Sequence, residues 1–132
     1  MPKALQLNLK LQNQPGTLAK LCRDLADQGV NLLALSAPDT GAKRGPIRLL
    51  VTLPELAEKK VAEAGYAFTT EEVIYVELKN RPGSLAKAME KLSNAKINVQ
   101  YAYATTHTRA QKTAVVIAVE SEDLPRALKL LG

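Results

Sequence analysis

The chain has 132 residues, 46% of them hydrophobic, which suffices for one ordinary domain or two very small ones with a buried core. The net charge is +5, but the basic residues form no block longer than a pair, so the charge pattern indicates a solvated surface rather than a nucleic-acid footprint. The single cysteine, Cys22, and the single histidine, His107, exclude an internal disulfide and argue against a metal site, and we expect neither a metal nor a cofactor.

Near the N-terminus, apolar and polar residues alternate, which predicts a strand with one buried face formed by Leu5, Leu7, Leu9 and Leu11. This alternation is neither the continuous apolar stretch of a signal peptide nor a membrane span of about 20 residues. We therefore expect a cytoplasmic protein in a reducing compartment that does not bind membranes.

The pattern then becomes helical. Leu18, Leu21, Cys22 and Leu25 follow the spacing i, i+3, i+4, i+7, which predicts a helix with an apolar face, and Gly29 is expected to end it. On this stripe Cys22 is expected to be a buried core residue rather than a reactive thiol.

A second strand of about eight residues is expected from Val30, followed by a turn-rich loop at residues 39–46 and a third strand at residues 47–53. Pro54 then lies in the first turn of a second helix, and a fourth strand is expected at residues 66–70. The inward-facing residues of that helix are expected to be Ala57, Val61 and Ala64. The expected order of elements in the first half of the chain is therefore βαββαβ.

The same order repeats in the second half of the chain. The segment Asn13–Lys20 matches Asn80–Lys87 at six of eight positions, and the offset of 67 residues continues without a gap. The second copy is predicted to have a strand at residues 74–78, a helix with its apolar stripe, a strand from Ile97 and a strand at residues 113–120. The stripe consists of Leu85, Ala88, Met89 and Leu92. The last helix is expected to be capped by Ser121, with Pro125 early and with Leu124, Ala127, Leu128 and Leu131 inward.

The second copy reaches Gly132 without a fourth strand of its own. One edge of its sheet is therefore left short, covered by the other copy or paired with a second chain, and we expect the chain to form a homodimer. The sequence predicts an α+β fold of two ferredoxin-like βαββαβ units, residues 1–71 and 72–132, with antiparallel sheets, helices on one face, and a second unit that lacks its own last strand.

A turn of the form Asn-x-Pro-Gly-[Thr/Ser]-Leu joins the first strand to the first helix in both copies. Pro15 and Pro82 lack an N–H, and Gly16 and Gly83 allow close approach to the backbone, so free N–H groups are expected at each helix N-terminus. The partial positive charge there suits a small carboxylate.

Asparagines recur around these turns. Asn13 and Asn80 offer amide donors and an acceptor for an ammonium group, and Asn31 and Asn98, 18 residues later, have the same chemistry at the start of a strand. A single such turn is explained by capping alone. Turn geometry gives no reason for the second asparagine to recur in both copies, which favours a ligand site.

The strand, the Asn-x-Pro-Gly-x-Leu turn, the amphipathic helix and the Val/Ile-Asn-Leu/Val strand start resemble the ACT domain, a ferredoxin-like module that binds amino acids and regulates their metabolism. Two copies without a catalytic domain are similar to stand-alone tandem ACT proteins. The resemblance implies ligand sites between paired ACT units, and it leaves open whether one or both are occupied. The implied ligand-binding residues are Asn13, Gln14, Pro15, Gly16, Thr17, Leu18, Asn31 and Leu32 in the first copy, and Asn80, Arg81, Pro82, Gly83, Ser84, Leu85, Asn98 and Val99 in the second.

Other chemistry-bearing residues are less informative. His107 is expected in a surface loop rather than as a catalytic base. Tyr101 and Tyr103 share one strand face, but the RNA-binding signature that would accompany stacking tyrosines is missing. No phosphate loop, carboxylate pair or nucleophile–base arrangement is present, so no catalytic residue is predicted.

The function predicted from the sequence is a non-catalytic sensor of a small amino acid. The alternative is a regulatory or docking subunit of an amino-acid biosynthetic enzyme with degenerate ligand sites, and nucleic-acid binding or enzymatic activity ranks last.

Overall fold

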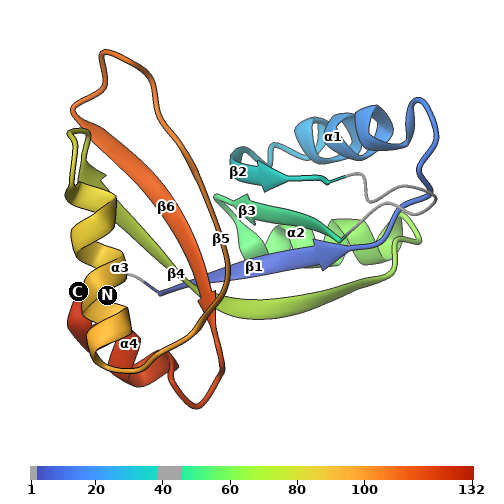
Figure 1. Ribbon diagram of the computed structural model, residues 1–132. Helices are drawn as coiled ribbons and strands as arrows, with labels where there is room; N and C mark the ends of the chain where they lie inside the picture. The colour runs from blue at the N-terminus through green and yellow to red at the C-terminus, as the bar shows by residue number, and fades with distance from the viewer. Residues whose placement is uncertain (1–2, 39–45) are drawn as a thin grey trace. The chain divides into compact units, whose positions relative to one another are not determined.

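A computed structural model describes residues 3–38 and 46–132 of the chain (Figure 1). The chain folds as two compact units. The N-terminal unit is Leu5–Glu71, and the C-terminal unit is Glu72–Gly132 together with Lys3 and Ala4. The loop expected at residues 39–46 lies, apart from Pro46, outside the described residues.

The N-terminal unit contains β1 (Lys3–Leu9), α1 (Thr17–Asp27), β2 (Leu32–Ser36), β3 (Ile47–Val51), α2 (Pro54–Glu63) and the first part of β4 (Phe68–Lys79). Its strand order is β2-β3-β1-β4, and β3 is antiparallel to both β1 and β2. Leu7 and Leu49 lie opposite each other and bury the same face against Leu21 of α1 and Val61 of α2. The alternation of leucines therefore supplies the sheet side of the core, as predicted.

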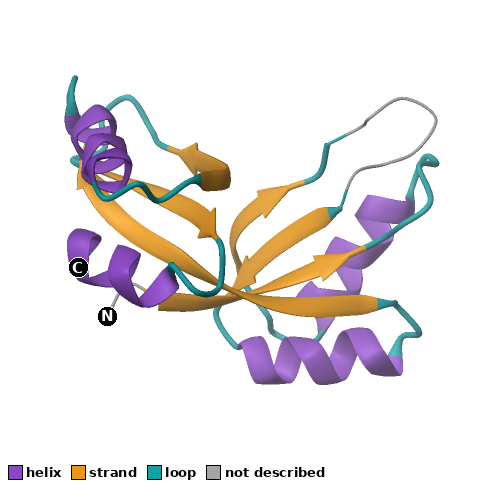
Figure 2. Cartoon of the chain, turned by 60° about the horizontal axis from the view of Figure 1, so that its bottom comes forward, coloured by secondary structure: helices purple, strands orange, loops and turns teal. Residues whose placement is uncertain are grey.

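The C-terminal unit repeats this arrangement with the second part of β4, α3 (Ser84–Asn94), β5 (Val99–Thr105), β6 (Lys112–Val119) and α4 (Leu124–Leu131). β6 is antiparallel to β4 and β5, with Val76 opposite Val115. Both belong to a core that includes Leu92 of α3 and Leu128 of α4. In each unit both helices lie on one side of the strands (Figure 2), so the predicted α+β fold of two ferredoxin-like units is confirmed.

The strands expected at residues 66–70 and 74–78 form one strand, β4, of 12 residues. It is the last strand of the first copy and the first strand of the second. The start of β1, Lys3 and Ala4, belongs to the C-terminal unit, and Lys3 forms a 2.8 Å ion pair with Glu72. Part of the edge that the second copy leaves open is therefore covered by the start of the chain.

Five local predictions are wrong. Ala64, expected on the inward face of α2, is exposed. Cys22 is only half-buried and is not part of the core. Leu85, expected on the apolar stripe of α3, is 47% exposed. Ser121 does not cap α4, since residues 121–123 form a turn and Asp123 is the N-cap. Gln6, placed on the polar side of its strand, is fully buried and donates from Nε2 to Oδ1 of Asn8 at 2.8 Å.

Two absences hold for the described ranges. No helix within residues 3–38 or 46–132 combines the length and apolar character needed to cross a bilayer. The same residues contain no group of three or more His, Cys, Asp or Glu side chains that could hold a metal ion.

Candidate functional site

The two Pro-Gly turns adopt the same backbone conformation. Gly16 has φ 90° and ψ −15°, and Gly83 has φ 92° and ψ −15°, and each is the N-cap of its helix. This left-handed conformation is strained for any residue with a Cβ, which explains why glycine stands at both positions. A Cβ built on either glycine would meet no atom within 4 Å, so the space above both turns is open to an approaching group.

The helix N-termini at these turns have no side-chain cap. The hydroxyl of Thr17, which could have capped α1, donates instead to the main-chain oxygens of Gln12 at 2.8 Å and Gln14 at 3.1 Å. In both helices the first intrahelical donor is the fourth residue, since Lys20 donates to Gly16 and Lys87 donates to Gly83 at 2.9 Å. The amides of the second and third helical residues therefore point outward without a helical acceptor.

Asn80 has a structural role that the sequence did not reveal. Its side-chain amide donates to the main-chain oxygens of Ala110 at 2.9 Å and His107 at 3.2 Å, and its main-chain N–H donates to Gln111 at 2.9 Å. Both amide hydrogens of Asn80 are thus engaged with the loop between β5 and β6. The expectation that Asn80 offers these donors to a ligand is not met in this conformation, and only its amide oxygen is left for an ammonium group.

Asn31 and Asn98 lie just before β2 and β5, as predicted, but far from the turn of their own unit. Because β1 and β2 are both antiparallel to β3, the end of β1 lies beside the start of β3, whereas the start of β2 lies beside the end of β3. The main chain of Asn31 pairs with Thr52, at the far end of β3. Helix α1, with 11 residues, separates turn from strand start by about 16 Å.

The remaining predicted residues fall into two groups. The exposed residues of the turns are Asn13, Gln14, Pro15, Arg81 and Pro82. The half-buried residues are Ser84, together with Leu18, Leu32 and Val99, which pack against the cores. Each turn therefore offers a polar rim, while the residues following Asn31 and Asn98 are anchored by packing.

A second polar cluster, which was not predicted from the sequence, lies in the groove between α1 and α2. The groove has a volume of about 330 Å³. In it Asp24 accepts hydrogen bonds from Lys20 at 2.8 Å and from Tyr66 at 2.9 Å. The hydrogen bonds from Lys20 and Tyr66 hold the pKa of Asp24 below its ordinary value, and burial together with the bond to Asp24 raises the pKa of Tyr66. In the sequence, only the spacing of four residues between Lys20 and Asp24 on a predicted helix indicates this cluster.

His107 and the tyrosines of β5 occupy the places expected for them. His107 is exposed in the β5–β6 loop, where its Nδ1 accepts a 3.2 Å hydrogen bond from the amide of Arg109. Tyr101 and Tyr103 alternate with exposed residues along β5 and share one face of it.

Comparison with known proteins identifies the family. The family model described as an ACT domain pair matches residues 3–131. The crystal structure of protein BT0572 from Bacteroides thetaiotaomicron is 28% identical with a TM-score of 0.87, and the match covers 98% of this chain and 87% of that chain. A comparison with curated proteins gave no match.

Two further similar structures are regulatory subunits of aspartate kinase. The one from Thermus flavus is 19% identical, with a TM-score of 0.65 and coverage of 99% of this chain and 91% of that chain. The ligand-free one from Thermus thermophilus is 17% identical, with a TM-score of 0.67 and coverage of 98% and 91%. At these identities the likeness is one of fold.

Proposed function

Because the chain belongs to the family of ACT domain pairs, we propose that it is a non-catalytic regulatory protein that binds a small amino acid at interfaces of its ACT units. The observation that carries this proposal is the pair of matched turns, in which Gly16 and Gly83 leave a helix N-terminus without a side-chain cap beneath open space. The α-carboxylate of an amino acid fits such a position, since it accepts N–H bonds and is stabilised by the helix dipole.

The ammonium group of the ligand also needs a hydrogen-bond partner, and the position of Asn31 limits which unit can supply it. Asn31 lies about 16 Å from the turn of its own unit, so one amino acid cannot contact both within a single unit. We propose that each site combines the turn of one ACT unit with the strand start of another, and that Leu32 or Val99 shapes the side-chain pocket. In this arrangement ligand binding stabilises the association of units.

A site built in this way would be completed in a homodimer, which we propose for this chain. Strand β2 is an edge strand of the N-terminal unit, and Leu33 and Leu35 on it are 42% and 40% exposed. Exposed leucines on an unpaired edge favour association. A ligand that bridges two units would regulate only if a second state binds it less tightly.

The second candidate function is a regulatory or docking subunit of an amino-acid biosynthetic enzyme, acting in the cytoplasm. Two proteins of the same fold, from Thermus flavus and Thermus thermophilus, are regulatory subunits of aspartate kinase, which supports this candidate. Asn80 also favours it for the second turn, since engaged amide donors are expected at a degenerate site.

A thermal-shift screen against the twenty amino acids, with nucleotides as controls, distinguishes the two functions. Saturation at about one hundred times the Kd adds roughly 2.7 kcal/mol to the stability of the native state, which raises the Tm by several degrees. A selective shift with one class of amino acid is the result expected for a sensor. No shift at millimolar concentration would reject the sensor and favour the docking subunit.

A further inference from the structure

The C-terminal unit has an open groove at the outer edge of β4. The groove has a volume of about 220 Å³ and is lined by Leu78 and Lys79 of β4, Ser84, Lys87 and Lys91 of α3, and Leu131 of α4. We call this the edge groove. The edge groove adjoins the second Pro-Gly turn, because Ser84 lines it. The role inferred for this groove goes beyond the amino-acid binding proposed for the turns.

The described part of β1 does not reach the edge groove. On its other side β4 pairs with β6, with Lys79 opposite Lys112. Lys3, the first described residue of β1, forms its ion pair with Glu72. Glu77 lies five residues beyond Glu72 along β4, roughly 16 Å away. The side chain of Lys3, which bonds Glu72, therefore does not reach Glu77. The backbone of β4 at residues 77–79 thus has no partner on this side among the described strands.

The internal repeat shows what occupies the equivalent place in the N-terminal unit. Positions Lys20, Asp24 and Ala64 correspond, by the offset of 67 residues, to Lys87, Lys91 and Leu131. There the extended segment that follows α2 lies over α1, with Tyr66 and Phe68 packed against the core. Tyr66 donates to Asp24 at 2.9 Å, and Nζ of Lys20 lies 5.8 Å from the centre of its ring. In the first copy an extended segment with aromatic side chains therefore lies beside the equivalent residues, at the border of the groove between α1 and α2.

The charges of the edge groove differ from those of its counterpart in one respect. Where the first copy has the pair Lys20 and Asp24, the second has two lysines, Lys87 and Lys91, and neither forms an ion pair within the described chain. Lys79 adds a third positive charge, against the single carboxylate of Glu77. These charges favour a segment that brings a carboxylate where Tyr66 brings a hydroxyl.

We propose that the edge groove binds an extended segment of a partner protein as an added strand on β4, with an aromatic residue against Leu78 and Leu131 and a carboxylate between Lys87 and Lys91. Strand addition of this kind draws affinity from main-chain hydrogen bonds and specificity from alternate side chains. A second copy of this chain fits less well, because neither of its edge strands, β2 (Leu32–Ser36) and β5 (Val99–Thr105), carries a carboxylate.

The chain supplies its own probe. The peptide corresponds to residues 65–72 with Tyr66 replaced by glutamate, Gly-Glu-Ala-Phe-Thr-Thr-Glu-Glu. It is fluorescently labelled and blocked at both ends, so that it offers no free α-amino or α-carboxyl group to the Pro-Gly turns. Binding is measured by fluorescence anisotropy, and the contact is mapped by hydrogen exchange of the full chain.

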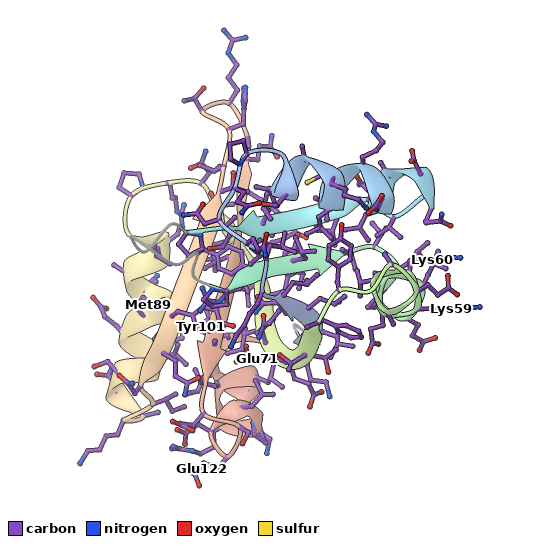
Figure 3. The ribbon with its side chains drawn as sticks, turned by 90° about the vertical axis from the view of Figure 1, so that its right-hand side faces the viewer. Lys59, Lys60, Glu71, Met89, Tyr101 and Glu122 are labelled. Atoms are coloured by element: carbon purple, nitrogen blue, oxygen red, sulfur yellow. The ribbon has the colours of Figure 1, made fainter. Side chains whose placement is uncertain are left out.

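We expect saturable binding and slower exchange of the main-chain amides at residues 77–79. The double variant K87E/K91E should weaken binding at least about tenfold, and replacing the phenylalanine of the peptide by alanine should do the same. The matched control is K59E, because Lys59 projects outward from α2 in the other unit (Figure 3); it should bind the peptide as the unmodified protein does.

Three results would overturn the proposal. The first is no saturable binding up to about 1 mM peptide. The second is binding that K87E/K91E leaves unchanged. The third is protection of residues 77–79 that rises with protein concentration in the absence of peptide, which would assign the groove to a second copy. The amino-acid screen is independent of all three, so failure of this proposal and failure of the sensor function are distinguishable.

Discussion

The side-chain amide of Asn80 donates a 2.9 Å hydrogen bond to the main-chain oxygen of Ala110, 30 residues away. This bond joins the second Pro-Gly turn to the loop between β5 and β6. It gives an asparagine that the sequence marks as a ligand donor a role in holding the C-terminal unit together. Both amide hydrogens of Asn80 are therefore already engaged within the C-terminal unit.

Replacing Asn80 with alanine tests that role. The variant N80A leaves the main-chain oxygens of His107 and Ala110 without this donor, and we expect the free energy of unfolding to fall by about 1–2 kcal/mol. Hydrogen exchange at Ala110 and Gln111 should become faster. Asn94, exposed at the end of α3, gives the control N94A. Exchange in N80A equal to that of the unmodified protein would show that the loop does not depend on Asn80.

The ends of α1 and α3 provide a matched test of backbone strain. Gly29 and Lys96 occupy equivalent positions after the two helices, and both are left-handed, with φ 76° and 59°. A lysine in this region is strained whereas a glycine is not, so K96G is expected to stabilise the protein by about 0.5–1 kcal/mol. The reverse change, G29K, should destabilise it by a similar amount. Urea denaturation measures both, and a K96G variant less stable than the unmodified protein would contradict the prediction.

The bonds between Asp24, Lys20 and Tyr66 predict a dependence of stability on pH. The pKa of Asp24 is lower in the folded state than the ordinary value of 3.8, first through the hydrogen bond from Lys20 and then through that from Tyr66. Its stabilising contribution is therefore complete above pH 3.8 and is lost as the pH falls through the lowered pKa. The Tm of D24N should lie below that of the unmodified protein at neutral pH, and the difference should shrink on acidification.

The control for this series is E122Q, because Glu122 is exposed before α4 and belongs to no ion pair among the described residues (Figure 3). It should follow the unmodified protein throughout. A difference between D24N and the unmodified protein that stays constant from pH 7 to pH 2.5 would contradict the role assigned to these hydrogen bonds.

A substitution of Asn31 tests the proposal that a site combines the turn of one ACT unit with the strand start of another. Only its main chain has a described partner in the fold, Thr52, so N31A should leave the Tm unchanged. If the side-chain amide contacts a bound amino acid, affinity should fall about tenfold or more, which corresponds to about 1.4 kcal/mol. Isothermal titration calorimetry measures this. Unchanged affinity in both N31A and N98A would show that these asparagines do not contribute to amino-acid binding.

Much of the fold follows from the sequence because the repeat makes each pattern visible twice. The leucines of β1 and the helical stripe of α1 are periodic enough to place the core of the N-terminal unit. The merging of two expected strands into β4 was not predicted, because the repeat suggested a boundary between the copies. The lack of a turn signal within residues 66–78 is consistent with the single strand that forms. Ser121 misled because a good capping residue also favours a turn, and here the turn formed.

The backbone of the two turns could be predicted from the sequence, but the surroundings of their asparagines could not. The Pro-Gly motif fixes a left-handed N-cap locally, so Gly16 and Gly83 could be read directly. The engagement of Asn80 depends on a loop 27–30 residues away, and no local pattern reveals it. That Asn31 lies at the opposite end of α1 from its own turn follows from strand direction, which is known only once the sheet order is known.

The most direct test of the central claim is a titration of the ¹⁵N-labelled full chain, followed by NMR, with the amino acid that gives the largest thermal shift. The account predicts saturable shifts of the amides of a Pro-Gly turn, at residues 16–19 or 83–86, together with those at a strand start, residues 31–32 or 98–99. These shifts should give one Kd. Saturable shifts confined to other parts of the chain, or none with any amino acid, would contradict the claim that these turns bind amino acids.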